Sequence, residues 1–172
     1  MENTLYFAYG SNINLDQMAY RCPDAQVVGP VTLENYELLF RRGGFATIAP
    51  KEGESVTGLL WSITPGCERS LDRYEGYPRF YDKRMVTVRD SEGRSLSVMA
   101  YIMDERFREP MLPTESYYNG ILEGYRQNGL PGSALKKAWD HAVQEVHQET
   151  GRINDTVCQQ LRAPKRRNGH ER

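Results

Sequence analysis

Strand-like and helix-like segments are separated along this sequence, and the separation limits its fold more than any other feature. Between residues 25 and 103, apolar runs alternate with turn residues, a pattern that predicts β-strands with one short helix among them. From Ser133 to Glu149, apolar residues recur every three or four positions, which predicts a helix with one apolar face. Because strands gather in the middle and helices at the end, the sequence predicts an α+β fold with a mainly antiparallel, strongly curved sheet.

Capping and turn residues set the predicted boundaries of the other elements. Leu5 to Tyr9 is an apolar run that predicts a buried strand, and either Asn12 or Asn14 caps the helix that follows. Thr64 as a cap and Pro65 at the first helical position predict a helix that ends at Gly76. The remaining predicted elements are helices over 14–20 and 115–127 and a hairpin of strands over 80–89 and 95–103.

The length of 172 residues is typical of one domain. Because the apolar pattern fades after Gly151, we expect a single domain over 1–150 and a C-terminal extension over 151–172 that ends in a flexible basic tail. The formal net charge of -1 favours neither nucleic acid nor a membrane as partner. The basic run at 165–167 leaves a nucleic-acid adaptor as an alternative, although a solubilising tail is the preferred interpretation.

Cysteine usage and the N-terminal residues predict the compartment. Cys22, Cys67 and Cys158 are odd in number and far apart, which favours a reducing environment over a disulfide framework. The N-terminal segment MENTLYFAYG does not resemble a signal peptide, and no apolar run approaches the roughly 18 residues of a membrane span. We therefore expect a cytoplasmic protein.

The first candidate site is the turn Tyr9-Gly10-Ser11-Asn12, which follows the first predicted strand. Successive backbone N–H groups at such a turn can bind a carboxylate or a developing oxyanion, especially where a helix follows. Gly10 also lets a ligand approach the backbone closely. From composition alone, an ordinary strand-to-helix turn is the favoured alternative.

The second candidate is Glu75, at the end of a predicted helix and among the aromatic residues Tyr74, Tyr77 and Tyr81. The negative end of the helix dipole and burial among aromatic rings both raise the pKa of a carboxyl group. A Glu with a raised pKa is a better proton acceptor near neutral pH. The alternatives are a solvated surface Glu75 before a capping glycine and Asp72 as the functional carboxylate.

Metal and cysteine chemistry have weak support in this sequence. His141 and His147 are six residues apart on a predicted helix, so their side chains point to different faces. Cys67 is more typical of a core residue than of a nucleophile, and no metal-ligand spacing is present. We therefore expect no metal site.

Four motifs in order connect the two candidate sites. The segments YFAYGSN near the N-terminus, GGFATI at 43–48, LDRYEGY at 71–77 and NGLP at 128–131 together resemble the γ-glutamylcyclotransferase family. The resemblance covers about residues 4–132. It implies a small mixed, mainly antiparallel β-barrel flanked by helices. It also implies a cofactor-free enzyme that closes a γ-glutamyl group into 5-oxoproline and releases an amino acid or amine.

The resemblance also assigns roles to residues. The segment that binds the glutamyl group corresponds to Tyr6, Phe7, Ala8, Tyr9, Gly10 and Ser11, and the proton acceptor corresponds to Glu75. A pocket tyrosine about ten residues before NGLP corresponds to Tyr117, with the adjacent Tyr118 as the alternative match. The expected partner is a small γ-glutamyl substrate, and a homodimer is left open. The alternative function is a binding module that holds a γ-glutamyl or carboxylate ligand without turnover.

The motifs depart from two branches of this family. The turn YGSN differs from the YGSL-like turn of glutathione-degrading members and from the YGTL-like turn of members that act on γ-glutamylamines. This difference favours a γ-glutamyl amino acid as substrate. The stretch RYEGYPRFYDK is unusually rich in tyrosine, which leaves a different leaving-group pocket as an alternative.

Overall fold

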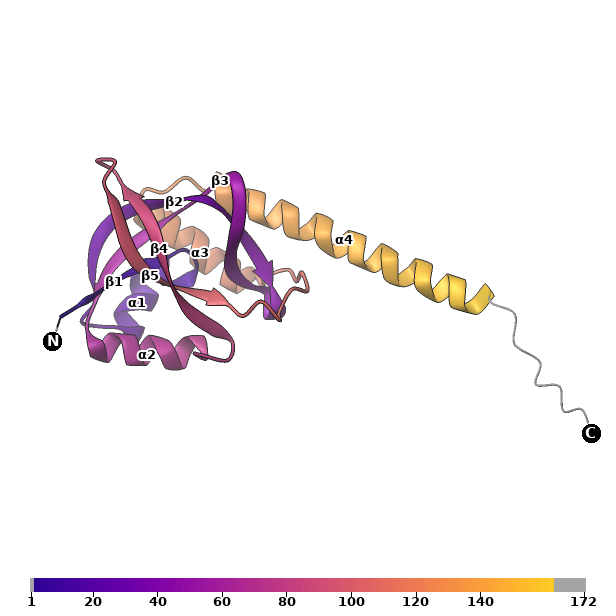
Figure 1. Cartoon of the computed structure of the whole chain (residues 1–172), viewed down its shortest axis with the longest axis horizontal. Helices are drawn as coiled ribbons and strands as arrows, with labels where there is room; N and C mark the ends of the chain where they lie inside the picture. Colours follow the sequence, from indigo (N-terminus) through magenta and orange to yellow (C-terminus); the bar gives the residue numbers. More distant parts are fainter. Residues whose placement is uncertain (1, 163–172) are drawn as a thin grey trace, which may run out of the picture.

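Five strands close into a barrel in the computed structural model, which describes residues 2–162 (Figure 1). The strands are β1 (Thr4–Ala8), β2 (Gln26–Arg41), β3 (Phe45–Ile63), β4 (Tyr81–Asp90) and β5 (Ser95–Met103), in the spatial order β1-β3-β2-β4-β5. All neighbouring pairs are antiparallel except β1 and β5, which meet in parallel where Tyr6 pairs with Met99. The structure therefore confirms a small mixed, mainly antiparallel barrel in an α+β fold.

Two long strands form most of the barrel wall, where the sequence suggested several shorter ones. β2 and β3 are joined at the short 3₁₀ turn η2 (Arg42–Gly44), and their register shifts at Val27/Gly29 and at Glu34/Tyr36. Such irregularities bend a strand without ending it, which is how one hairpin can wrap around a core. Gly58 of β3 allows β1 to pack closely, since a side chain there would clash with the Ala8 carbonyl oxygen.

The helices are η1 (Ser11–Ile13), α1 (Leu15–Arg21), α2 (Pro65–Glu75), α3 (Glu115–Gln127) and α4 (Ser133–Arg162). Capping residues mark the start of α1 and both ends of α2, as the sequence patterns indicate. Asn14, rather than Asn12, caps α1 by accepting a hydrogen bond of 3.0 Å from the Gln17 amide. Thr64 caps α2 in the same way, and Gly76 ends it in the left-handed conformation with φ of 64°.

The hydrophobic core fills the barrel and continues beneath the helices. Phe7, Phe40 and Leu59 are fully buried inside it. Ile121 and Tyr125 of α3 join the same cluster, as do Leu135, Ala138 and Ala142 of α4. α3 approaches η1 so closely that a side chain at Gly124 would lie 2.6 Å from the Asn14 amide nitrogen. The core thus fixes the N-terminal turn between the barrel and α3.

α4 is longer than the sequence pattern indicated. Its first half packs on β2, where Arg41 forms an ion pair of 2.7 Å with Glu145. The helix then continues past Glu149 to Arg162 and projects away from the barrel (Figure 1). Every side chain from His147 to Arg162 is exposed, so no apolar stripe marks this part of the helix. Within residues 2–162, no helix is long and apolar enough to cross a membrane.

The predicted helix end at Glu149 is therefore wrong. The boundary between a domain over 1–150 and an extension over 151–172 stays a prediction, because the basic end of the chain lies outside the described residues.

Candidate active site

A cavity of about 260 Å³ lies where the end of β1, the η1 turn, the end of α2 and the start of α3 meet. It brings together two segments that are more than sixty positions apart, around Ser11 and around Glu75. Most of the lining is aromatic. The lining residues are Tyr6, Tyr9, Gly10, Ser11, Asn12, Phe45, Ala46, Tyr74, Glu75, Phe80, Tyr81, Tyr101 and Tyr117.

Six of the eight predicted site residues line this cavity, namely Tyr6, Tyr9, Gly10, Ser11, Glu75 and Tyr117. The other two, Phe7 and Ala8, are buried in the barrel core and are not part of the lining. Adjacent residues of a strand point to opposite faces, so Phe7 faces away from Tyr6. Its ring lies 6.0 Å from the ring of Tyr9, behind the turn.

The two alternatives at these positions lie outside the cavity. Tyr118 packs against Trp139 of α4, with ring centroids 5.4 Å apart, so Tyr117 is the tyrosine that faces the cavity. Asp72 accepts a hydrogen bond of 2.6 Å from the Tyr101 hydroxyl and forms an ion pair of 2.8 Å with Lys83. These partners hold the Asp72 carboxylate in a network with Lys83 instead of in the cavity.

Glu75 is the last residue of α2, and its side chain turns into the cavity. The residue is half-buried, and its Oε1 accepts a hydrogen bond of 3.3 Å from Nδ2 of Asn12. Burial raises the pKa of Glu75 to about 7, while the positive charge of Arg21 acts in the opposite direction. A carboxyl group with this pKa exchanges protons readily near neutral pH, as a general base or acid must.

The glycine turn is held from several sides. The Trp61 indole donates a hydrogen bond of 3.0 Å to the Asn12 carbonyl oxygen, and the Tyr9 hydroxyl donates to the Tyr101 carbonyl oxygen. The first amides of η1, at Ser11 and Asn12, have no acceptor within so short a helix, so they can donate to a ligand. A side chain at Gly10 would lie 3.3 Å from Cβ of Ala46, in the space that the cavity occupies.

Tyrosine hydroxyls surround the backbone of Ala46 on the facing wall. The Tyr81 hydroxyl donates a hydrogen bond of 2.6 Å to the Ala46 carbonyl oxygen, and the Tyr117 hydroxyl accepts one of 3.1 Å from the Ala46 amide. Burial raises the pKa of Tyr6, Tyr9, Tyr81 and Tyr117. These phenols are therefore neutral near pH 7. The hydroxyls of Tyr6 and Tyr117 accept hydrogen bonds from Asn12 and from the Ala46 amide, so their own protons can be donated to a bound anion.

Sequence reasoning anticipated part of this aromatic wall. Of the three tyrosines predicted around Glu75, Tyr74 and Tyr81 line the cavity, whereas Tyr77 lies outside it beneath Lys83. Phe45 and Ala46 belong to the motif GGFATI, which could have been assigned to the site. No local pattern identified three further residues near the cavity, Phe80, Tyr101 and Arg21.

The described residues 2–162 contain no group of three or more histidine, cysteine, aspartate or glutamate side chains that could hold a metal ion. The titratable groups of the cavity are one carboxylate and several phenols. This set suits proton transfer and hydrogen bonding to a small polar ligand.

Comparisons with known proteins agree with this architecture. Residues 6–119 match the family described as "Gamma-glutamyl cyclotransferase, AIG2-like". Gamma-glutamylcyclotransferase of Bos taurus is 33% identical over 147 residues, which are 79% of this chain and 77% of the bovine protein. The protein of the same name from Homo sapiens is 30% identical over 167 residues, covering 91% of this chain and 86% of the human one.

A solved structure named "Gamma-glutamyl cyclotransferase" has a TM-score of 0.72 and 30% sequence identity over 80% of this chain and 86% of that chain. The family match covers well over half of the chain and includes both the glycine turn and Glu75. This chain therefore belongs to the γ-glutamyl cyclotransferase, AIG2-like family.

Proposed function

We propose that this protein is a γ-glutamylcyclotransferase that converts a γ-glutamyl amino acid or amine into 5-oxoproline and releases the amino acid or amine. Family membership and relatives of that name support the activity. The single observation that carries the residue roles is the position of Glu75. Its carboxylate, with a pKa of about 7, shares one cavity with the backbone of Gly10 and Ser11.

Glu75 acts as the general base in this proposal. The α-amine of the substrate is an ammonium near neutral pH and becomes a nucleophile only when it loses a proton, which Glu75 accepts. The amine nitrogen then attacks the γ-carbonyl carbon and closes a five-membered ring. The bond from that carbon to the leaving nitrogen breaks, and Glu75 returns a proton to the leaving nitrogen. After the attack, Glu75 accepts a second proton from the ring nitrogen and passes it to the leaving amine, which departs as an ammonium, so the two protons lost by the ring nitrogen are the two gained by the amine.

The glycine turn stabilises the developing negative charge. When the amine attacks, the carbonyl oxygen becomes an oxyanion that needs preorganised donors, and the amides of Ser11 and Asn12 can provide them. Trp61 holds this turn from behind, through its bond to the Asn12 carbonyl oxygen. Because nucleophile and electrophile belong to one molecule, folding the glutamyl chain inside the cavity supplies much of the acceleration.

The tyrosines that line the cavity bind the glutamyl group. Tyr6, Tyr9 and Tyr117 are neutral phenols around the cavity and act as hydrogen-bond partners for the substrate. Phe7 and Ala8 support the turn from the core instead of touching the substrate. The partner is a small γ-glutamyl compound. Free thiols at Cys22, Cys67 and Cys158 support a cytoplasmic location.

The direct test compares the wild-type protein with Glu75→Gln in an assay for 5-oxoproline. The panel contains γ-glutamyl amino acids, γ-glutamylamines and glutathione. We expect the wild type to release 5-oxoproline from at least one class and Glu75→Gln to be roughly 10²–10⁴-fold slower, as expected for the loss of a general base. Asp72→Asn is the matched control, because its carboxylate lies outside the cavity.

Two results would contradict the proposal in different ways. A folded Glu75→Gln variant with the wild-type rate would remove Glu75 from the role of base. A wild-type protein that binds γ-glutamyl compounds and releases no 5-oxoproline from any of them would favour the non-catalytic binding module instead.

A further inference from the structure

Arg21, the last residue of α1, forms an unusual set of contacts beside the cavity. Its guanidinium donates hydrogen bonds to three neutral side chains, at 3.1 Å to Oγ of Ser11, 2.6 Å to Oδ1 of Asn12 and 2.9 Å to Oε1 of Gln17. It also lies over the ring of Tyr74, 3.8 Å from the centroid. Within residues 2–162, it forms no ion pair with a carboxylate, so its charge is not neutralised by direct contact.

These contacts join the two halves of the site. Ser11 and Asn12 belong to the glycine turn, whereas Tyr74 immediately precedes Glu75 at the end of α2. The hydroxyls of Ser11 and Tyr74 are themselves only 3.4 Å apart. The guanidinium therefore contacts the glycine turn on one side and Tyr74, the residue before the base, on the other.

Arg21 also determines which way the Asn12 amide group points. With Oδ1 of Asn12 bound to Arg21, Nδ2 faces the Tyr6 hydroxyl at 2.9 Å and Oε1 of Glu75 at 3.3 Å. The reverse orientation would turn the amide NH₂ toward the guanidinium, donor against donor, and the amide oxygen toward the Glu75 carboxylate. The charge-assisted bond from Arg21 thus keeps a hydrogen-bond donor directed at the base.

We propose that Arg21 is a positioning residue for the reaction: its guanidinium holds Ser11 and Asn12 against Tyr74 and keeps the Asn12 amide directed at Glu75. The inference rests on the proposed γ-glutamylcyclotransferase function. Arg21 is not part of the cavity lining, so it acts through Asn12 and not on the substrate. Lysine cannot replace it, because a single ammonium does not reproduce the planar fork that binds three acceptors and stacks on a ring.

The charge of Arg21 gives this role a second, measurable consequence. The other titratable groups that face the cavity are phenols, from Tyr6 and Tyr9 on the β1 side, Tyr74 on α2, Tyr81 on β4, Tyr101 on β5 and Tyr117 on α3. Within residues 2–162, Arg21 is the cation that lowers the pKa of Glu75 against the effect of burial. Removing the charge while keeping the bulk should therefore raise that pKa.

The first experiment measures the pKa of Glu75 in the ligand-free protein, from the carboxyl carbon signal in NMR spectra recorded across pH. Arg21→Met should raise this pKa above the wild-type value of about 7 by about one unit, whereas Arg21→Lys should leave it close to wild type. Arg73→Met is the matched control, because Arg73 is exposed and is not among the groups that shift Glu75. This experiment needs no turnover, so it tests Arg21 even if the protein releases no 5-oxoproline.

The second experiment measures kcat and KM for 5-oxoproline release. Arg21→Met and Arg21→Lys should both lower kcat by about 10–100-fold with a smaller change in KM, because base and donors are misplaced. Combining Arg21→Met with Asn12→Leu should cost little more than Asn12→Leu alone, since Arg21 acts through Asn12.

Three results would overturn the inference. The first is an unchanged Glu75 pKa and rate in Arg21→Met. The second is a wild-type rate in Arg21→Lys, which would show that only the positive charge at this position matters and not the contacts of the guanidinium. The third is full additivity in the double variant. If Arg21→Met does not fold, as judged by circular dichroism, the rate of Arg21→Lys decides the question.

Discussion

Replacing Glu75 with glutamine should make the protein more stable at alkaline pH, even though it removes the proposed base. Burial raises the pKa of Glu75 to about 7, from an ordinary value of 4.5. The folded state therefore holds this proton more tightly than the unfolded state does. Ionising the carboxyl group above this pKa costs the folded state free energy, and a neutral amide of the same shape avoids that cost.

The size of the effect follows from the two pKa values. A difference of about 2.5 units corresponds to about 3 kcal/mol, at about 1.36 kcal/mol per unit. The favourable contribution of the protonated group is fully present below pH 4.5 and is lost as the pH rises to about 7. Glutamine can still accept the hydrogen bond from Asn12. The stability difference between variant and wild type should thus be small near pH 4 and reach about 3 kcal/mol near pH 8.

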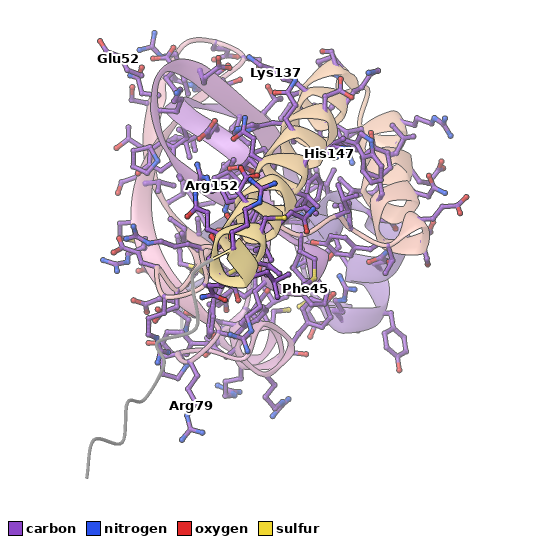
Figure 2. All side chains as sticks on the ribbon, turned by 90° about the vertical axis from the view of Figure 1, so that its right-hand side faces the viewer. Phe45, Glu52, Arg79, Lys137, His147 and Arg152 are labelled. Atoms are coloured by element: carbon purple, nitrogen blue, oxygen red, sulfur yellow. The ribbon has the colours of Figure 1, made fainter. Side chains whose placement is uncertain are left out.

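Urea unfolding followed by tryptophan fluorescence measures this difference at several pH values. Glu52→Gln is the matched control, because Glu52 is an exposed residue of β3 at the edge of the molecule, and it should show no such pH dependence (Figure 2). A stability difference between Glu75→Gln and wild type that does not change with pH would refute the reasoning. So would a variant that is less stable than wild type near pH 8.

Three further predictions follow from the Glu75 pKa, from one hydrogen bond and from one close packing contact. The acid limb of kcat/KM should have its midpoint near pH 7, because Glu75, with a pKa of about 7, must be ionised to accept a proton; a limb near pH 4.5 would contradict this. Tyr117→Phe should lower the free energy of unfolding by about 1–3 kcal/mol, measured in urea, because the Ala46 amide loses its acceptor. Gly58→Ala should cost about 1–3 kcal/mol in the same assay, since its methyl group meets the Ala8 carbonyl oxygen, and an unchanged midpoint would show that β1 can move away.

Local signals in the sequence predicted most elements because each depends on a few neighbouring residues. Thr64, Pro65 and Gly76 define α2 through capping and the left-handed turn, and the structure confirms all three. The closure of the barrel has no such signal. It depends on the parallel pairing of Tyr6 with Met99, more than ninety positions apart, and was expected only from the family resemblance.

The end of α4 was missed for a related physical reason. An apolar stripe marks a helix face that packs on something, and the exposed side chains from His147 to Arg162 pack on nothing in the described part of the chain. Gly151 lowers helix propensity by about 1 kcal/mol but does not prevent the backbone from continuing. The repeat of apolar residues therefore indicates the part of α4 that packs on the barrel, and it does not indicate the residue at which the helix ends.

The site was predicted in part. Glu75 and the glycine turn carry recognisable motifs, so the residues that face the cavity from these segments could be named in advance. Arg21 stands before Cys22 and Pro23, and the sequence indicated only a helix end there. Its role depends on contacts with Ser11, Asn12 and Tyr74, which tertiary packing brings within reach and no sequence spacing reveals.

The pairing of Tyr6 with Met99 joins the first strand to the last, and the same tyrosine lines the cavity. A molecule that binds in the cavity will stabilise the pairing of β1 with β5, and so will stabilise the whole barrel against thermal unfolding. A ligand that binds only the folded state at about 100 times its Kd adds about 2.7 kcal/mol of stability. The increase in melting temperature on adding a compound can therefore rank candidate ligands by affinity. The measurement needs no turnover, so it also works with the Glu75→Gln variant.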